Sequence, residues 1–538
     1  MKIIYSKKGS KLPFEERSRS LREDQPYSGD YWGAFSLEWY ARAFPLWNTH
    51  NDAQGWVDYA TQFNPVNFWL KDWNVRAWAY YEDYDNWKDT YGMDAVNAVY
   101  HSGHGGIDAQ GVFRTPMGRD WGDLGTTVYS DKMQLGNEQV NYIFWSTCYS
   151  CRISEGHTPI RTWGSANKGF RMLFGYESTS VDSPNYGKYF WEEWNKGKPL
   201  STAFCDASWR IHQGQSPAVV ACGSDKDEAK NRLYTEREFH WEHVSTDYWY
   251  WRWYTADDNT RDPNYTFPKD MMIAELQPVE VDEQYVRSVV DSCNIEMKLP
   301  GEVAATREGI FSLKEGDIRA AFGENGEFEV KMAKPNLSNT EQISLRKARS
   351  LADKAVKEYS LDKEVGLTFD RVRLEGEGGG TKDEREREGP YMTGTTVQFK
   401  QVINSLPVLT PGAGEVTVSV DNDGVVTGVH ASTRFIDKLT DRPKNTIAPP
   451  LDEGFLCRPR AEDMAGCREL LKKEWEKMVA LWKARGKAPE KYAAVPGFTE
   501  IGYDIQGNEA VLAARQVMEV DFGDGYHKLY WVVTPLLG

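Results

Sequence analysis

Two stretches decide the fold that this sequence predicts: AVNAVYHSGHGG (residues 95–106) and NYIFWSTCYSC (residues 141–151). Each begins with a short apolar run, AVNAVY (95–100) or YIFWS (142–146), which is too short for a helix. The runs are continuous rather than alternating in polarity, as is typical of strands buried on both faces. Polar residues follow each run directly. We therefore expect both polar segments at the carboxyl ends of strands in one sheet.

Further strands and helices surround these two. FRMLFGY (170–176) and PAVVACG (217–223) predict two more buried strands, and the apolar spacing of residues 189–211 predicts a helix pair between them. Strands that alternate with helices favour an α/β fold, a mostly parallel sheet sandwiched by helices. In such sheets the ligand crevice lies at the carboxyl ends of the strands. This is where we expect the chemistry.

Composition excludes several classes of protein. The chain has 538 residues, a net charge of -16 and seven cysteines. The negative charge disfavours nucleic acid as a partner, and the low, odd cysteine count excludes a disulfide scaffold. No apolar run of about 18 residues exists, so we expect no membrane-spanning helix. The first residues lack the apolar stretch of a secretory signal, which predicts a cytoplasmic protein if the sequence is full length and a secreted one if a leader was removed.

The aromatic residues mark a first domain boundary. Of 21 tryptophans, 18 lie at or before Trp253. The polar segment 255–270 then reads as a linker. We interpret DYWYWRWY (247–254) as an aromatic core segment or as cover for the seam between domains, since its exposure would favour aggregation.

The C-terminal half predicts two α+β units, each a helix followed by antiparallel strands. The helices are expected at 345–360 and 461–485, and hairpin turns are expected at GENGE, DNDG and FGDG. The charged, glycine-rich stretch GEGGGTKDEREREG (376–389) is expected to be a mobile, solvated loop. The predicted division of the chain is 1–258, a linker and β-rich segment at 259–334, an α+β unit at 335–440 and a second α+β unit at 441–538.

The two polar segments suit a cysteine–histidine dyad. An imidazole can take the proton of a thiol and hold the thiolate, which attacks a carbonyl carbon. Glycines beside a histidine leave backbone N–H groups free to hold an oxyanion. His104, followed by Gly105 and Gly106, fits this role, and the N–H of Cys148 is a natural second donor.

Other interpretations of the same residues stay open at this point. His101, His104, Cys148 and Cys151 are four ligands of types that bind zinc. Cys148 and Cys151 form a CxxC pair that could make a redox disulfide. A lone cysteine after a strand can also be only a small core residue, and HSGHGG only a tight turn.

The order and spacing of the two segments resemble the caspase-like cysteine peptidases (clan CD), which include caspases, legumains, gingipains, clostripain and separases. AVNAVYHSGHGG matches their His block and NYIFWSTCYS their Cys block, and the resemblance covers about residues 25–255. It implies a caspase-like fold, with Cys148 as nucleophile, His104 as base and the Gly105 N–H as an oxyanion donor.

The sequence also departs from the caspases in two respects. It has no recognisable linker for cleavage into subunits and no basic cluster for an acidic P1 residue, so specificity for aspartate is not expected. Asp182, Asp206 and Asp225 could line a pocket for a basic P1 side chain, although each is more typical of a surface or capping carboxylate.

A second resemblance lies at about residues 335–435. VQFKQVINSLPVLTPGAGEVTVSVDNDGVVTGVHAST is similar to the propeptide domains of thermolysin-like and fungalysin-like peptidases and to PepSY modules. Such domains chaperone or inhibit an attached peptidase, which here would precede them. No HExxH motif occurs, so a thermolysin-type catalytic domain is not expected. A plain β-sheet module that binds substrate or partner is the alternative.

Together these observations predict a cysteine peptidase with a C-terminal inhibitory, chaperone-like or substrate-binding region. A peptide ligase or transpeptidase that uses the same dyad, and a non-catalytic peptide-binding protein on a degenerate scaffold, remain alternatives. We expect a peptide or protein as substrate, no metal and no cofactor, and intramolecular inhibition by the C-terminal region as an option.

Overall fold

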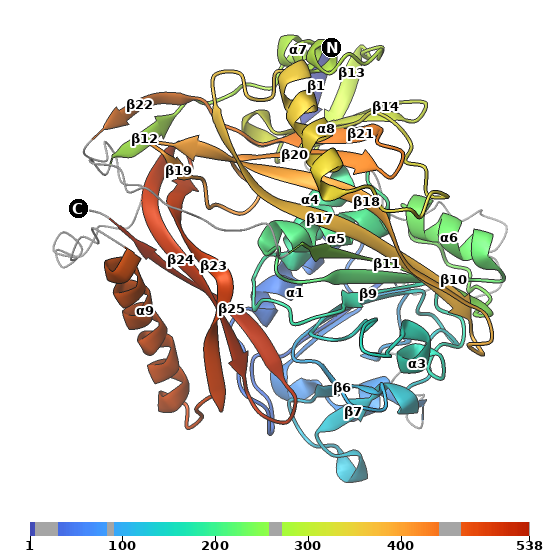
Figure 1. Ribbon diagram of the computed structural model, residues 1–538. Coiled ribbons are helices and arrows are strands. Elements are labelled where there is room, and N and C mark those ends of the chain that lie inside the picture. The colour runs from blue at the N-terminus through green and yellow to red at the C-terminus, as the bar shows by residue number, and fades with distance from the viewer. Residues whose placement is uncertain (6–30, 83–90, 258–271, 441–463, 537–538) are drawn as a thin grey trace.

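The computed structural model describes residues 1–5, 31–82, 91–257, 272–440 and 464–536. Over these residues the chain is a mixed α/β protein with eight α-helices and one dominant sheet of 15 strands (Figure 1). The predicted α/β class is therefore confirmed at this level. The predicted linker at 255–270 falls almost entirely outside the described residues.

The N-terminal half of the large sheet is parallel. Its strands run in the order β3-β2-β4-β8-β9, with the bounds Trp32–Ser36 (β2), Phe68–Lys71 (β3), Ala98–Ser102 (β4), Tyr142–Ser146 (β8) and Met172–Tyr176 (β9). Every residue of β4 and β8 is buried, as their continuous apolar runs predict. The next strand, β10 (Pro217–Gly223), pairs antiparallel with β9, so the sheet is mixed.

Helices cover both faces of this half. One face packs on four helices: α1 (Thr49–Ala60), α4 (Tyr186–Asn195), α5 (Leu200–Ile211) and α6 (Lys226–Thr235). The opposite face packs on the short helix α3 (Pro159–Trp163) and on loop residues. The predicted helix pair at 189–211 corresponds to α4 and α5 and is confirmed.

A strand of aromatic residues joins the two halves of the sheet. In β11 (Tyr248–Ala256), which pairs antiparallel with β10 on one side and with β17 (Gly366–Thr381) on the other, Trp249, Trp251 and Tyr254 are buried. The segment predicted as an aromatic core is therefore a seam strand. The predicted peptidase-like and propeptide-like segments share one continuous sheet through it.

Beyond β17 the large sheet is antiparallel. It continues through β18 (Arg387–Ile403), with β19 (Leu406–Pro407) beside it, then β20 (Glu415–Asp421), β21 (Val426–Ala431), β16 (Phe328–Lys331), β15 (Ile318–Phe322) and β14 (Phe311–Glu315). The helices α7 (Glu283–Ser292) and α8 (Leu345–Glu358) pack on it (Figure 1). The helix predicted at 345–360 and the turns predicted at GENGE and DNDG are confirmed.

The prediction of a mobile loop at 376–389 is wrong. Most of this stretch belongs to β17 and β18, and Gly376, Gly378 and Gly379 lie against rings of β11. A Cβ on Gly376 would lie 2.3 Å from the ring of Trp253, and one on Gly379 would lie 2.6 Å from that of Tyr250. Because these glycines have no side chains, they leave room for the aromatic rings of β11.

The C-terminal residues form a separate five-stranded sheet. Its strands are β22 (Ile436–Thr440), β12 (Ile273–Leu276), β24 (Glu509–Asp521), β23 (Lys491–Gln506) and β25 (His527–Pro535). Helix α9 (Met464–Ala484) packs on this sheet, which confirms the second predicted helix over its described residues (Figure 1). The FGDG turn joins β24 to β25, as expected.

Two small sheets complete the described fold. β1 (Lys2–Tyr5) pairs with β13 (Glu302–Ala305), and β5 (Gly106–Ile107), β6 (Phe113–Pro116) and β7 (Thr127–Tyr129) form a three-stranded sheet after β4. None of the helices in the described ranges is both long and apolar enough to cross a bilayer.

We predict that Gly376→Val destabilises the protein by about 1–3 kcal/mol, because the added methyl groups overlap the Trp253 ring at a buried seam. Gly366→Val on the same strand is the matched control, since a Cβ there meets no atom closer than 3.6 Å. Thermal and urea unfolding measure both variants. Equal stability of the two variants would contradict the packing role of the glycine.

Candidate functional site

The two predicted reactive segments leave the sheet side by side. β4 and β8 are neighbouring parallel strands with Ser102 opposite Ser146, so the loops that carry His104 and Cys148 start at the same edge. A Cβ added to Gly105 would lie 2.6 Å from the carbonyl oxygen of Cys148, so the two loops touch through their backbones. The structure thus brings the predicted residues to one place, and glycine is required at that contact.

A buried carboxylate fixes the ends of both strands. Asp52, on α1, accepts hydrogen bonds from Ser102 Oγ (2.7 Å), Ser146 Oγ (2.8 Å) and Tyr100 OH (2.8 Å). It also accepts one from the backbone N–H of Gly187 at 2.9 Å. Burial raises the pKa of Asp52, against the opposing effect of these hydrogen bonds. No sequence motif marks this residue, because an aspartate on an amphipathic helix carries no local signal of its role.

His104 is held in one orientation. Its Nε2 lies 3.0 Å from the carbonyl oxygen of Phe44, which requires a proton on Nε2. Nδ1 then carries the lone pair, and this buried atom has no hydrogen-bond partner among the described residues. Burial, together with the positive charge of Lys528, lowers the pKa of His104 to about 3. The imidazole is therefore neutral here, with Nδ1 as the free acceptor.

Cys148 is fully buried, and its thiol contacts backbone groups. Its Sγ donates to the carbonyl oxygen of His527 at 3.1 Å and accepts from the N–H of Ser180 at 3.3 Å. No hydrogen bond joins the side chains of His104 and Cys148. The N–H groups of Gly105 and Cys148, the predicted oxyanion donors, donate to no residue in the described part of the chain.

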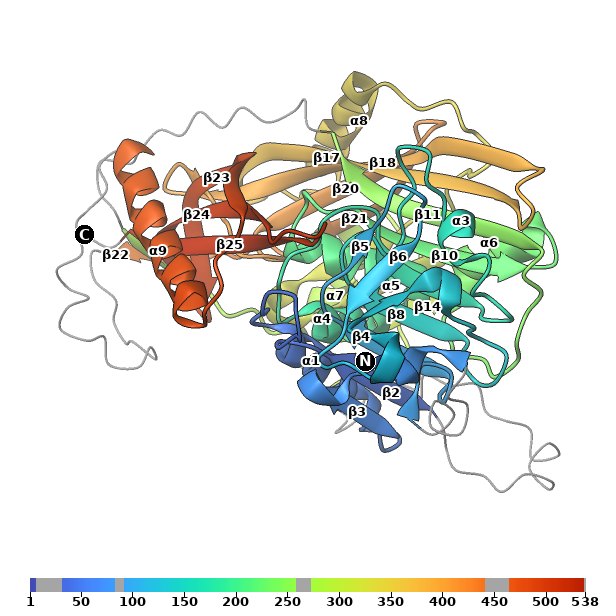
Figure 2. The same cartoon turned by 90° about the horizontal axis from the view of Figure 1, so that it is seen from below.

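The hairpin of β24 and β25 covers both side chains. Ring centroids of Phe522 and Tyr526 lie 5.2 and 5.6 Å from that of His104. Lys528 Nζ donates to Ser180 Oγ at 2.9 Å, and this hydroxyl lies 3.4 Å from Sγ of Cys148. Figure 2 shows the tips of β24 and β25 directed toward the segment of β5 and β6. The site is therefore closed by the chain itself.

The structure does not support the zinc and redox interpretations. His101 points into the core, where its Nδ1 bonds to the hydroxyl of Tyr80 at 2.8 Å. Cys151 is a buried free thiol whose pKa is raised mainly by burial, and the other five cysteines in the described ranges are also free and buried. Histidine and cysteine ligand atoms do not converge anywhere in those ranges.

The three aspartates considered for a P1 pocket have structural partners. Asp182 accepts the N–H groups of Trp47 (2.9 Å) and Asn48 (3.2 Å), and burial raises its pKa to about 6. Asp225 caps α6 by accepting the N–H of Glu228. Asp206 belongs to a charged cavity described next. Of the three, only Asp182 contacts the covering hairpin, since its N–H donates to Leu529 of β25 at 2.9 Å.

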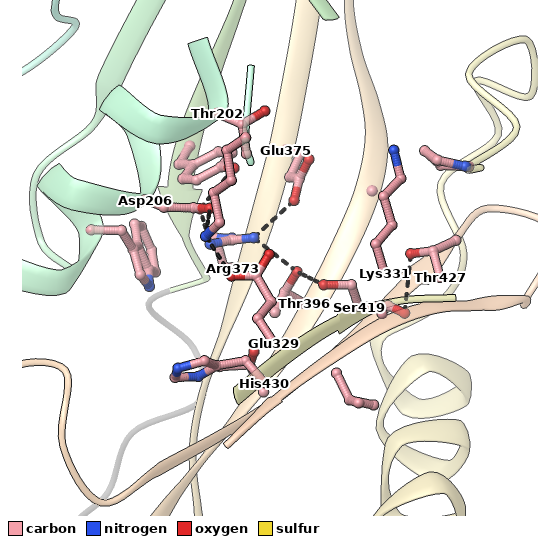
Figure 3. Close-up of a pocket in the computed structure, with 18 of the residues that line it drawn as sticks. Thr202, Asp206, Glu329, Lys331, Arg373, Glu375, Thr396, Ser419, Thr427 and His430 are labelled. Carbon is pink, nitrogen blue, oxygen red and sulfur yellow. Dashed lines mark hydrogen bonds and ion pairs between the residues drawn. The ribbon is translucent and has the colours of Figure 1, made fainter. Parts of the chain in front are cut away.

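A cavity of about 240 Å³ lies between α4–α5 and the C-terminal part of the large sheet (Figure 3). Glu193, Asp206 and Glu329 converge there at metal-ligand spacing. The ammonium group of Lys198 occupies their centre, at 2.6, 2.7 and 2.5 Å from the three carboxylates. These carboxylates raise the pKa of Lys198 against the effect of burial. A lysine thus supplies the cation, and the cluster is an ion-pair network that links α4 and α5 to the antiparallel part of the large sheet.

A second ion-pair network lines the same cavity. Arg373 bridges Asp206 at 3.1 Å and Glu375 at 3.0 Å, and Glu375 also pairs with Arg252 (Figure 3). Since Asp206 lies on α5 and Arg373 on β17, the network clamps the helices of the parallel half to the antiparallel half.

Comparison with known proteins gives one family match. Residues 28–253 match a family described as a domain of unknown function (DUF6345). This segment includes β4, β8, His104 and Cys148 and ends within the seam strand β11. No curated protein matches the chain.

We predict that Lys198→Met destabilises the protein by about 2–3 kcal/mol, because it removes the cation that three closely spaced carboxylates share, although Lys196, Arg373 and Arg319 each still pair with one of them. Lys226→Met is the control. Lys226 is 47% exposed and pairs with Glu388, and losing such a pair costs about 1 kcal/mol or less. Thermal unfolding measures both variants. A neutral Lys198→Met variant, or a wild-type protein that loses stability on chelation of divalent ions, would contradict the assignment.

Proposed function

We propose that this chain is a cysteine peptidase in which Cys148 is the nucleophile and His104 the proton acceptor. One observation supports this most directly: the two side chains lie at the carboxyl ends of adjacent parallel strands, where their loops touch at Gly105. The orientation of His104 adds to it, since Phe44 leaves Nδ1 as a free acceptor in a buried site. The resemblance to caspase-like peptidases names the same pair.

The proposed reaction is acyl transfer. His104 Nδ1 takes the thiol proton, and Sγ of Cys148 attacks the carbonyl carbon of a bound peptide. The N–H groups of Gly105 and Cys148 stabilise the oxyanion, which is possible because neither is engaged elsewhere in the described chain. The imidazolium then gives its proton to the leaving amine. Water, activated by the neutral imidazole, hydrolyses the thioester and regenerates the thiol.

The C-terminal region belongs to this proposal as an inhibitory element. The resemblance of residues 335–435 to propeptide and PepSY modules first suggested such a role. The contacts that cover the site come instead from the β24–β25 hairpin, in the second α+β unit. Attack on a peptide therefore needs the hairpin to leave the thiol.

The test uses the intact chain and an opened variant, defined as Tyr526→Ala with Lys528→Ala, which removes two side chains that close the site. We expect the opened variant to cleave members of a positional-scanning peptide library, detected by mass spectrometry. Cys148→Ala should abolish cleavage, and His104→Ala should lower the rate by about 10²–10⁴-fold. Cys151→Ser, three residues away, is the matched control and should retain activity.

Two results would contradict the proposal. One is an opened variant whose Cys148 reacts with iodoacetamide but which cleaves no peptide; it would assign the site to peptide binding without catalysis. The other is cleavage that survives Cys148→Ala. Transfer of the acyl group to an added amine in place of water would identify a ligase that uses the same dyad.

A further inference from the structure

We infer that the tip of the β24–β25 hairpin, residues 522–529, is a built-in peptide mimic that keeps Cys148 latent, and that activation consists of its withdrawal. This inference rests on the proposed function, because latency has meaning only for a reactive thiol. It identifies the segment of the second C-terminal unit that occupies the site.

The hairpin binds the site largely through its backbone, as an extended peptide does. The N–H of Leu529 donates to the carbonyl oxygen of Ser180 at 3.1 Å, and the N–H of Asp182 donates to the carbonyl oxygen of Leu529 at 2.9 Å. These bonds form a parallel bridge between Val181 and Leu529. Addition of a strand to an exposed edge is a common mode of peptide recognition. The hairpin therefore occupies a position that fits an extended chain.

The geometry at the thiol shows why the hairpin is not itself cleaved. Attack needs the carbonyl carbon at Sγ and the carbonyl oxygen at the oxyanion donors. Here the oxygen of His527 faces Sγ, at 3.1 Å, and accepts its hydrogen bond. The N–H groups of Gly105 and Cys148 do not bond to this oxygen. The carbonyl is thus bound in a non-reactive orientation, with its oxygen rather than its carbon at Sγ.

The turn of the hairpin closes the histidine side of the site. Arg114, on β6, donates to the carbonyl oxygen of Asp524, and its guanidinium lies 5.5 Å from the ring of Tyr526. The carbonyl oxygen of Gly525 lies so near Gly106 that a Cβ there would come within 2.8 Å of it. This backbone contact places the turn directly on the HSGHGG segment. Both halves of the dyad are therefore covered by one continuous stretch of chain.

The tip belongs to a different sheet from the strands that carry the dyad. β24 and β25 belong to the five-stranded sheet, whereas β4 and β8 belong to the large sheet. The tip is seated by the hydrogen bonds and ring contacts described above and by the buried side chains of Phe522, Tyr526 and Leu529. Its withdrawal exposes the thiol together with these side chains, while the β24–β25 ladder can stay paired.

The test measures access to the thiol and needs no catalysis. The full-length protein, the opened variant and the control Val533→Ala are treated with iodoacetamide, and alkylation of each cysteine is followed by mass spectrometry. Val533 is on β25 but 49% exposed and away from the site. We expect Cys148 to react at least about tenfold faster in the opened variant than in wild type or control. Cys151, buried and free, should stay slow in all three and reports unfolding.

A peptide supplied in trans gives the second readout. A synthetic peptide of residues 519–531 should slow alkylation of Cys148 in the opened variant, and a scrambled peptide should not. If the double variant unfolds, so that Cys151 reacts as well, the single variants Tyr526→Ala and Lys528→Ala carry the test with the same expectation.

The outcomes separate this inference from the peptidase proposal. Equal reactivity of Cys148 in wild type and variants overturns the inference, as does a wild-type chain that cleaves peptides as fast as the opened variant; the second result leaves the peptidase proposal standing. Faster alkylation without any peptide cleavage supports the hairpin as a cover and overturns the peptidase proposal instead.

Discussion

The buried carboxylate of Asp52 is the constraint on which the geometry of the site depends. It accepts hydrogen bonds from the hydroxyl groups of Ser102 and Ser146, the last residues of two neighbouring strands, and so fixes where the following loops begin. An isolated buried carboxylate is costly, and its four hydrogen bonds offset that cost only if both strand ends stay in register. The positions of His104 and Cys148 follow from this register.

The same sheet explains how so large a chain positions a hairpin over one edge. The aromatic strand β11 joins the parallel half to β17, and glycines on β17 make room for its rings. The ionic cluster around Lys198 clamps α4–α5 to the antiparallel half across that seam. With these two halves fixed, the C-terminal sheet contacts the large sheet through the bridge between Tyr503 of β23 and Val408 next to β19, and its hairpin lies at the site.

Local patterns in the sequence were sufficient for much of this fold. The strand predicted at 95–100 lies at 98–102, and the strand predicted at 142–146 lies at those residues. The helix predicted at 345–360 spans 345–358, and the hairpin turns at DNDG and FGDG are present, so apolar periodicity and turn residues located these elements to within a few residues. The two segments that we predict to be reactive were singled out because each follows such a strand.

The features that the sequence did not reveal depend on contacts between distant residues. The glycine-rich stretch 376–389 resembled a loop, because its partner, the aromatic strand β11, lies more than 100 residues earlier. Asp52 carries no motif, and its role exists only once α1 packs under β4 and β8. The covering hairpin could be suspected from the propeptide resemblance, but the segment that covers Cys148 lies some 90 residues beyond that resemblance.

The hairpin that covers Cys148 also buries the ammonium group of Lys528, which is unfavourable. Lys528 is 2% exposed, and its hydrogen bond goes to the hydroxyl of Ser180 rather than to a carboxylate. Burying an ammonium group in this way costs free energy that the backbone bridge at Leu529 and the aromatic contacts of Tyr526 must offset. When the tip withdraws, the ammonium group of Lys528 is hydrated again. The free energy that favours the closed state is therefore the contribution of the backbone bridge and the aromatic contacts minus the cost of burying Lys528. If the hairpin acts as we infer, a peptide that makes the same backbone bonds without burying a charge displaces it from the thiol.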